Sequence, residues 1–268
     1  MGQIGASHTD TLAFLPTWLL GAGGGVLGLL VGSFIGAALL RMPEGRSLVF
    51  GRSRCDACGR RLGPGELVPV VSFLVLRGRC RSCKAPIDRW QPAAEACGAL
   101  VGALPWFFAH NALVAGAAVL MGWQLLLLAM LDLRHMWLPM RLVGALAATG
   151  LAIVLALGWL GEIAARITVA LIGGSLGWGL LALVAFIYRR SRGQDGMGRG
   201  DPPLLGAIGI WLGPLGVVEV LLGASLAGIL AAAALMALKR DVRGDTALPL
   251  GTCIAAAAWP LFVLQGFG

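Results

Sequence analysis

Charged side chains are scarce in this chain. Asp, Glu, Lys and Arg together make up 13% of its 268 residues, whereas soluble domains carry about 25%. Apolar residues make up 58% of the sequence, and the mean hydropathy is +0.84. A water-soluble globule could not cover that much apolar surface, and disordered chains have low hydrophobicity. The composition therefore excludes both classes and indicates an integral membrane protein.

The N-terminus also lacks the basic residues that open a cleavable signal peptide, because residues 1–18 contain no Lys or Arg. We therefore expect the first apolar stretch to remain as a membrane span. Further apolar stretches predict an all-α, polytopic membrane helix bundle with about eight transmembrane helices. The 203–213 stretch is short enough for a re-entrant segment, but the charge distribution favours a span. The eight stretches are 15–40, 93–109, 112–131, 142–160, 164–188, 203–213, 215–238 and 247–265.

Acidic residues are outnumbered, with 13 Asp and Glu against 21 Lys and Arg. In a soluble protein such an excess would point to nucleic acid, but in a membrane protein basic residues mark the cytoplasmic loops. Residues 41–92 contain eleven of them, and the next predicted inside loops bring the number to 20 of 21, leaving Arg166 near an outside end. The distribution predicts eight spans in lipid with both termini outside, and no nucleic-acid partner.

This topology divides the chain into three parts. Residues 1–40 are expected to form a periplasmic N-terminus and the first span, and residues 41–92 a small cytoplasmic insertion. Residues 93–268 are expected to form a seven-span membrane domain. The remaining inside loops lie near 132–141, 189–202 and 239–246.

Four of the six cysteines form two C-x-x-C pairs within the insertion: Cys55 with Cys58, and Cys80 with Cys83. Two such turns supply the four thiolates of a tetrahedral zinc site, and a closed four-ligand site is structural. A cytoplasmic location keeps thiols reduced. A redox dithiol and a quartet that only packs are the alternatives. Cys97 and Cys253 lie alone in apolar stretches and are interpreted as small buried residues.

Acidic residues in or beside the apolar stretches are few, and at membrane depth an ionisable group indicates function by default. Asp132 ends the third predicted span, and Asp201 begins the sixth after a glycine-rich run. Two carboxylates at one depth can share a proton, one acting as base and the other as acid. The alternative is that each aspartate only caps a helix or faces an arginine. Glu95 is also of interest, whereas Glu162 and Glu219 are interpreted as interfacial or bundle-facing.

These blocks together resemble the prepilin leader peptidases, which are membrane aspartic proteases of the GxGD class. The resemblance covers most of the chain. The matching segments, in order, are Gly32-Ser-Phe-Ile-Gly36 with Arg41 and Pro43, Glu66-Leu-Val-Pro69, Arg77-Gly-Arg-Cys80, Glu95, Asp132 with Pro139, Gly198-Arg-Gly-Asp201 and Pro249-Leu-Gly251.

The chain departs from the family pattern at several positions. The family usually has Lys two residues after the GxGD aspartate, where this chain has Pro203. Met140 stands where an acid often follows the proline of the first motif. Leu250 and Thr252 stand where Phe and Pro are usual.

The resemblance implies an enzyme of the bacterial inner membrane with its active site at the cytoplasmic face. It would cut the basic leader from type IV prepilins or type II secretion pseudopilins after a Gly. Asp132 and Asp201 would be catalytic, with Gly198 and Gly200 supporting the motif. The resemblance also implies N-methylation of the new N-terminus with S-adenosylmethionine, in which Glu95 is a candidate, although no Rossmann-type glycine fingerprint is present.

Two other classes of function stay open at this point. An ion-coupled transporter would use the membrane aspartates as ion ligands, but it gives no reason for a GxGD motif beside a cysteine quartet. A catalytically silent scaffold derived from a peptidase is indicated by Pro203 in the place of the family Lys.

Overall fold

The structure is a computed structural model that describes residues 15–48, 53–158, 163–193, 196–238 and 248–266. These residues form helices and no strand, which confirms the all-α prediction. Four helices are long and apolar enough to cross a membrane: α1 (Thr17–Arg41), α5 (Ala112–His135), α7 (Ile163–Arg192) and α8 (Asp201–Ala237). The chain is therefore an all-helical membrane protein.

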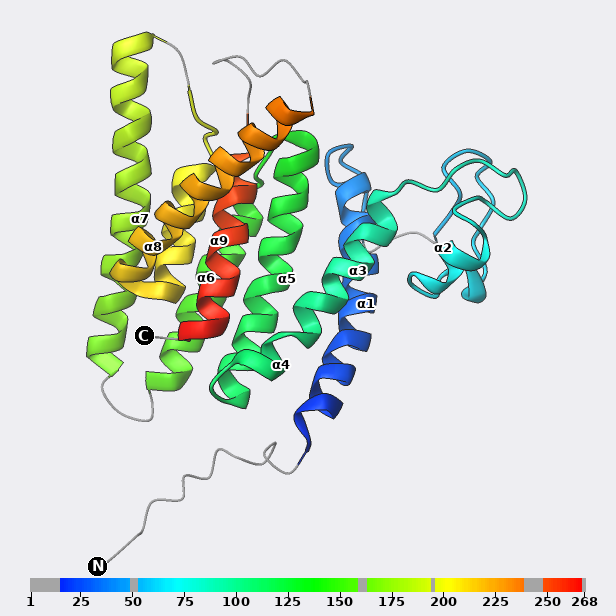
Figure 1. The fold of residues 1–268 in the computed structure, drawn as a ribbon, viewed down its shortest axis with the longest axis horizontal. Helices are drawn as coiled ribbons and strands as arrows, with labels where there is room; N and C mark the ends of the chain where they lie inside the picture. The colour runs from blue at the N-terminus through cyan, green and yellow to red at the C-terminus, as the bar shows by residue number, and fades with distance from the viewer. Residues whose placement is uncertain (1–14, 49–52, 159–162, 194–195, 239–247, 267–268) are drawn as a thin grey trace, which may run out of the picture.

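Shorter helices complete the bundle shown in Figure 1. Two of them are apolar, α6 (Met140–Gly158) and α9 (Leu250–Gln265). The predicted 93–109 stretch is divided into α3 (Trp90–Ala103) and α4 (Pro105–Phe108), because Pro105 begins a new helix where no backbone N–H is needed. A short 3-10 turn, η1 (Pro64–Glu66), and α2 (Val71–Val75) lie in the segment to the side of the bundle.

Helix α8 contains both of the stretches predicted at 203–213 and 215–238, joined at a sharp bend. Gly213 has φ 70° and ψ −175°, a conformation that favours glycine, and Pro214 follows it. A Cβ built at Gly209 would lie 3.0 Å from Cγ2 of Val217, so the chain turns back on itself. Figure 1 shows the two halves running in different directions. Residues 201–212 reach only about 18 Å at 1.5 Å per residue, which is short of the bilayer core.

Helices α1 and α3 pack backbone against backbone through small residues. A Cβ built at Gly98 would lie 2.5 Å from the carbonyl oxygen of Gly28, and one at Gly24 would collide with the carbonyl of Gly102. Glycines four residues apart on α1 thus face glycines four residues apart on α3. Such spacing allows the two helix backbones to approach closely in lipid, where the hydrophobic effect does not drive helices together and close packing must do so.

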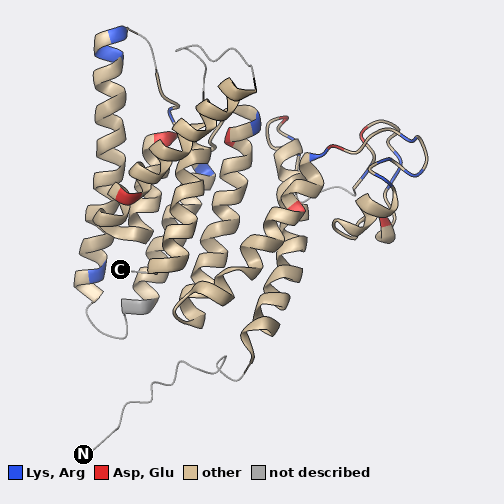
Figure 2. Cartoon of the chain, viewed as in Figure 1, with Lys and Arg blue, Asp and Glu red and all other residues tan. Residues whose placement is uncertain are grey.

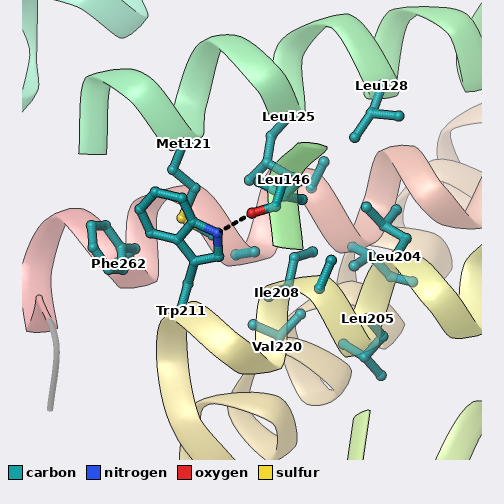
Figure 3. Packing of buried hydrophobic residues seen from close by; sticks show 14 of the residues in the cluster. Met121, Leu125, Leu128, Leu146, Leu204, Leu205, Ile208, Trp211, Val220 and Phe262 are labelled. Carbon is teal, nitrogen blue, oxygen red and sulfur yellow. Dashed lines mark hydrogen bonds between the residues drawn. The ribbon is translucent and has the colours of Figure 1, made fainter. Parts of the chain in front are cut away.

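The main core joins α5, α6, α8 and α9 (Figure 3). Trp211 of α8 is its largest buried side chain, and its indole N–H donates to the carbonyl of Leu146 at 2.9 Å. Its ring meets the ring of Phe262 edge to face, with 5.5 Å between the centroids. A buried indole with a hydrogen-bond partner favours one arrangement, so these contacts set how α6, α8 and α9 pack together.

The basic residues gather toward one end of the bundle and on the segment beside it (Figure 2). Helices α1, α5 and α7 end there, and α6, α8 and α9 begin there (Figure 1). Among the described residues, Arg166 in the first turn of α7 lies at the opposite end. The basic loop predicted near 239–246, together with Arg52 and Glu162, lies outside the described residues.

Candidate active site and metal centre

Asp132 lies in the last turn of α5 and is 5% exposed. The helix ends because Met136 takes a left-handed conformation, with φ 50°, and its N–H bonds back to the Asp132 carbonyl at 2.8 Å. The side-chain Oδ2 accepts the backbone N–H of Thr252 at 2.8 Å, and it shares the single hydroxyl proton of Thr252, at 3.1 Å, with the Ala129 carbonyl at 2.9 Å. Because α9 begins at Leu250, Asp132 satisfies one of the first-turn N–H groups of that helix.

Asp201 is the first residue of α8 and is 4% exposed. Its backbone N–H donates to the carbonyl of Gly198 at 3.1 Å, and the backbone N–H of Gly198 donates to its carboxylate. The next two residues, Pro202 and Pro203, are tolerated because first-turn N–H groups have no partner inside a helix.

The two aspartates come together around Leu138, which lies in the connection between α5 and α6 and is buried. A Cβ built at Gly200 would lie 2.5 Å from the Leu138 Cβ. One built at Gly251 would lie 2.9 Å from the Leu138 Cδ1 and 3.1 Å from Oδ2 of Asp132. The starts of α8 and α9 and the end of α5 therefore meet at one point, where the charge of Asp132 acts on Asp201.

Backbone conformation does not require a glycine at position 200 of the motif, because Gly200 has φ −86°, which any residue can adopt. Space is the constraint instead, because a Cβ at Gly198 would lie 2.9 Å from Oδ2 of Asp201 and one at Gly200 would meet Leu138. Both positions exclude side chains from the contact that brings the carboxylates together.

Thr252 is the residue of this site that sequence reasoning missed. It was noted only as a departure from the family's proline, yet it supplies both donors to Asp132. The substitution itself could have indicated this role, because a threonine has the backbone N–H that a proline lacks and adds a hydroxyl, and both groups can donate to a carboxylate. Asp132 is thus a helix cap and a member of a carboxylate pair at once, so the two interpretations do not exclude each other.

The four cysteines sit in two similar turns of the segment beside the bundle. Cys55 N–H bonds to the Arg60 carbonyl at 2.9 Å, and Cys80 N–H bonds to the Ala85 carbonyl at 2.8 Å. The residue after each C-x-x-C pair takes a left-handed conformation: Gly59 with φ 69° and Lys84 with φ 59°. Each turn therefore directs its two sulfur atoms to the same side.

The four sulfur atoms lie within 4.8 Å of one another, and those of Cys55 and Cys83 are 3.8 Å apart. A tetrahedral zinc with Zn–S bonds of about 2.3 Å has S–S edges of about 3.8 Å, so the quartet fits that ion. All four are free thiols. Backbone N–H groups of Cys83 and Ser82 lower the pKa of Cys80 to about 6, whereas burial and the neighbouring thiols raise the pKa of Cys83 to about 11, so Cys80 ionises more readily than Cys83.

Glu95 lies apart from these contacts, on α3, and is 5% exposed. Its Oε2 accepts the Val70 N–H at 2.6 Å, and its Oε1 accepts the Gln91 amide at 3.0 Å. It lines a cavity of about 390 Å³ beside the cysteine segment. A smaller cavity of about 220 Å³ lies between α7 and the 196–203 segment that contains the GxGD glycines. Glu219, by contrast, is exposed and bonds to Gln265 at 2.9 Å.

Comparisons with known proteins place most of the chain in one family. Residues 26–108 match the bacterial peptidase A24 N-terminal domain, and residues 118–233 match the type IV leader peptidase family. A prepilin leader peptidase/N-methyltransferase of Pseudomonas aeruginosa is 34% identical, over 95% of this chain and 91% of the relative. A protein of the same name from Burkholderia pseudomallei is 36% identical, over 94% and 87%.

A third relative with that name, from Stutzerimonas stutzeri, is 33% identical over 87% of each chain. No solved structure matches. The two family matches fall on either side of residues 109–117, and the second of them contains both aspartates. The chain belongs to the type IV leader peptidase family.

Proposed function

We propose that this protein removes the basic leader from type IV prepilins or type II secretion pseudopilins, cutting after a Gly, and then methylates the new N-terminus. The observation that carries the peptidase proposal is the pair of buried carboxylates, Asp132 and Asp201, at one meeting point of three helix ends. The relatives' names supply the substrate class and the second activity.

In the proposed reaction Asp132 is the base. Its Oδ2 already accepts the backbone N–H of Thr252 and has the Thr252 hydroxyl within reach, an arrangement that suits an ionised carboxylate. Asp132 takes a proton from water as the water oxygen bonds to the scissile carbonyl carbon. Asp201 gives its proton to the leaving nitrogen as the C–N bond breaks, so the two carboxyl groups exchange roles by the end of the cut.

Two other functions compete with this proposal. An ion-coupled transporter would use the same aspartates as ion ligands, and a silent scaffold would keep the geometry without the activity. Co-expression with the prepilin of Pseudomonas aeruginosa, followed by a gel mobility assay, separates them. We expect conversion to the shorter mature form. Unprocessed prepilin, with the protein present in the membrane, would rule out the peptidase.

For location, we propose eight spans in the bacterial inner membrane, with the aspartates and residues 41–92 at the cytoplasmic face. The clustering of basic residues at one end of the bundle supports this orientation. The bend at Gly213 also supports the eight-span topology, because it allows the first half of α8 to enter the bilayer and the second half to run back out of it. Reporter fusions after residues 90 and 268 should give cytoplasmic and periplasmic signals respectively, and a cytoplasmic signal from the second would overturn the topology.

For cofactors, we propose one structural zinc on Cys55, Cys58, Cys80 and Cys83, and S-adenosylmethionine as methyl donor. The near-tetrahedral sulfur spacing supports the zinc. A closed set of four thiolates leaves no open position for a substrate, so the ion would hold the fold and take no part in bond breaking.

Thr252→Val should lower the rate of leader cleavage by roughly tenfold or more, because a hydrogen bond to a charged group contributes about 1.5–3 kcal/mol. The valine keeps the backbone N–H to Asp132 and loses the hydroxyl, which also reaches the Ala129 carbonyl at 2.9 Å. Thr252→Ser should restore most of the rate. Single-turnover cleavage at saturating prepilin is the measurement.

The matched control for that change is Thr168→Val. The Thr168 hydroxyl bonds only within its own helix, to the Ala164 carbonyl at 2.7 Å, and the residue is exposed. Its loss should leave cleavage unchanged. If Thr252→Val and Thr168→Val changed the cleavage rate by the same factor, the Thr252 hydroxyl would have no special role at Asp132.

A further inference from the structure

The cysteine segment has an exposed apolar face that no described part of the chain covers. Its five residues are between 45% and 75% exposed, namely Leu67, Val68, Val71, Leu74 and Val75. Their spacing of three and four residues places them on one side of α2 and of the turn before it. The other side of α2 is turned inward, where Ser72, Phe73 and Leu76 line the cavity of about 390 Å³. An exposed apolar face of this kind marks an interaction surface.

One hydrogen bond sets the height of this apolar face along the bundle. The N–H of Val70, which directly precedes α2, donates to Oε2 of Glu95 on α3 at 2.6 Å. Glu95 in turn packs beside Gly32 of α1, where a built Cβ would lie 2.6 Å from the Glu95 Cα. Gly32 precedes Arg41, the last residue of α1, by about 13 Å at 1.5 Å per residue. The start of α2 therefore lies level with the interior of α1, and Figure 1 shows α2 at the height of α3.

The same hydrogen bond also holds α2 in its orientation. Val70 has φ 60° and ψ −48°, and Arg77, which follows the other end of α2, has φ 51°. A positive φ is unfavourable for a β-branched residue and persists only where surrounding contacts hold it. Glu95 supplies such a contact from α3. The turn into α2 is thus fixed by the helix bundle as well as by the cysteine segment itself.

Basic residues follow the apolar face directly along the chain. Residues 67–87 contain no Asp or Glu, and their four basic residues are all exposed: Arg77, Arg79, Arg81 and Lys84. Figure 2 shows basic residues along this segment. Glu66, just before the apolar face, is paired with Arg60. An apolar face bordered by basic residues is typical of elements that lie in the headgroup region of an anionic bilayer.

We propose that the apolar face of α2 inserts into the boundary between headgroups and acyl chains beside α1, with the four basic residues on anionic phospholipid headgroups. Interfacial elements bury their apolar faces about 5–10 Å deep in this way, and the bond to Glu95 sets a depth of that order. Lipid already surrounds α1 at this level, where Leu30 and Phe34 are 57% and 50% exposed. The bilayer therefore covers the face without a further protein. This contact goes beyond leader cleavage and does not depend on it.

Photo-crosslinking in nanodiscs tests the contact without any substrate. The full chain, one copy per disc, is placed in phosphatidylcholine with phosphatidylglycerol. A trace lipid has a diazirine either near the glycerol end or at the terminus of its acyl chain, and mass spectrometry maps the adducts. We expect the shallow diazirine to label residues 67–76 at least about tenfold more than the deep one, while both label α1. Absence of lipid adducts on residues 67–76 would overturn the proposal and leave the face to a second copy or another protein.

Polar side chains on the apolar face should weaken this labelling. Together, Val71→Gln, Leu74→Gln and Val75→Gln should lower the shallow labelling of residues 67–76 by at least about tenfold, because the bilayer would otherwise bury these side chains. All three are exposed, so the variant should keep the metal content of the wild type. Adducts on α1 in the same sample are the internal standard. Labelling at the wild-type level would contradict insertion, and a loss of metal would leave the decision to the charge variants.

The basic residues should make the contact depend on anionic lipid. In the wild type, phosphatidylglycerol should raise the labelling of residues 67–76 by about tenfold or more, and the triple variant Arg77→Gln, Arg79→Gln and Arg81→Gln should lose this dependence. The matched control removes three arginines from the last turn of α7 instead: Arg189→Gln, Arg190→Gln and Arg192→Gln. This control should keep the dependence at residues 67–76. Equal losses in both triple variants would show that net charge acts, and would overturn the role of the basic residues beside α2.

Glu95 is expected to act as the positioning residue for α2. Glu95→Ala should lower the shallow labelling of residues 67–76 severalfold, because the Val70 N–H loses its acceptor on α3. Glu95→Gln keeps an amide oxygen that can accept the same N–H and should retain most of the labelling. A loss in both variants, or in neither, would show that this hydrogen bond does not set the height of α2.

Discussion

Asp132→Asn and Asp201→Asn should each abolish leader cleavage, with a loss of at least about a thousandfold in rate, while the protein level in the membrane stays near that of the wild type. The amide is nearly the same size as the carboxyl group, but it neither takes up nor gives a proton at neutral pH. Each aspartate has a different role in the cut, so neither can replace the other.

The double variant should be no worse than either single one, because groups that act as a unit are not additive. Asp201→Asn keeps an oxygen that can accept the Gly198 N–H, and Asp132→Asn keeps one for Thr252. The helix ends should therefore stay in place. Prepilin conversion in membranes, followed over time on gels, measures the rates.

Glu219→Gln is the matched control for these carboxylates. Glu219 also lies on α8, but it is exposed and bonded to Gln265, away from the meeting point of the three helix ends. Its amide variant should cut at the wild-type rate. Near-wild-type cleavage by either aspartate variant would show that the pair is not the proteolytic centre.

Cys80→Ser should remove the bound zinc and unfold the cysteine segment while the helix bundle persists. The segment has little apolar core of its own, since Leu74 and Val75 of α2 are 67% and 75% exposed. Cys80 is its buried ligand. Without a core, the metal–thiolate bonds supply much of the folding free energy, as in other small zinc domains.

Zinc analysis and limited proteolysis measure this effect. The wild type should hold about one zinc per chain, and the variant none, with new cleavage sites between residues 53 and 89. Cys97→Ala on α3, outside the quartet, should keep the zinc and the protection. A wild-type protein without metal and with its cysteines oxidised in pairs would instead favour the redox dithiol.

Much of the helix arrangement could be predicted because it follows from composition. The described part of each apolar stretch is almost entirely helical, with the 93–109 stretch divided between α3 and α4. The boundary between the 203–213 and 215–238 stretches is the bend of α8 at Gly213 and Pro214. The position of this bend could be predicted because glycine and proline affect the backbone conformation at their own positions. The direction that the second half of α8 takes after the bend depends on packing against α7 and α9, which no local pattern contains.

The candidate site was predictable as a set of residues but not as a geometry. The spacing of the cysteines implied that four sulfur atoms would meet, and they do. The matched depth of Asp132 and Asp201 implied their proximity. The roles of Leu138 and Thr252 could not be predicted, because their contacts join residues separated by more than 60 positions in the chain.

The hydrogen bonds from Thr252 to Asp132 also have a consequence for when the protein becomes active. They come from α9, which is synthesised 120 residues after the aspartate that it orients. Under the proposed function, a nascent chain with seven segments inserted has both aspartates but no donors to hold the first of them. Under that proposal, we expect truncated chains lacking α9 to cut prepilins far more slowly than the full chain.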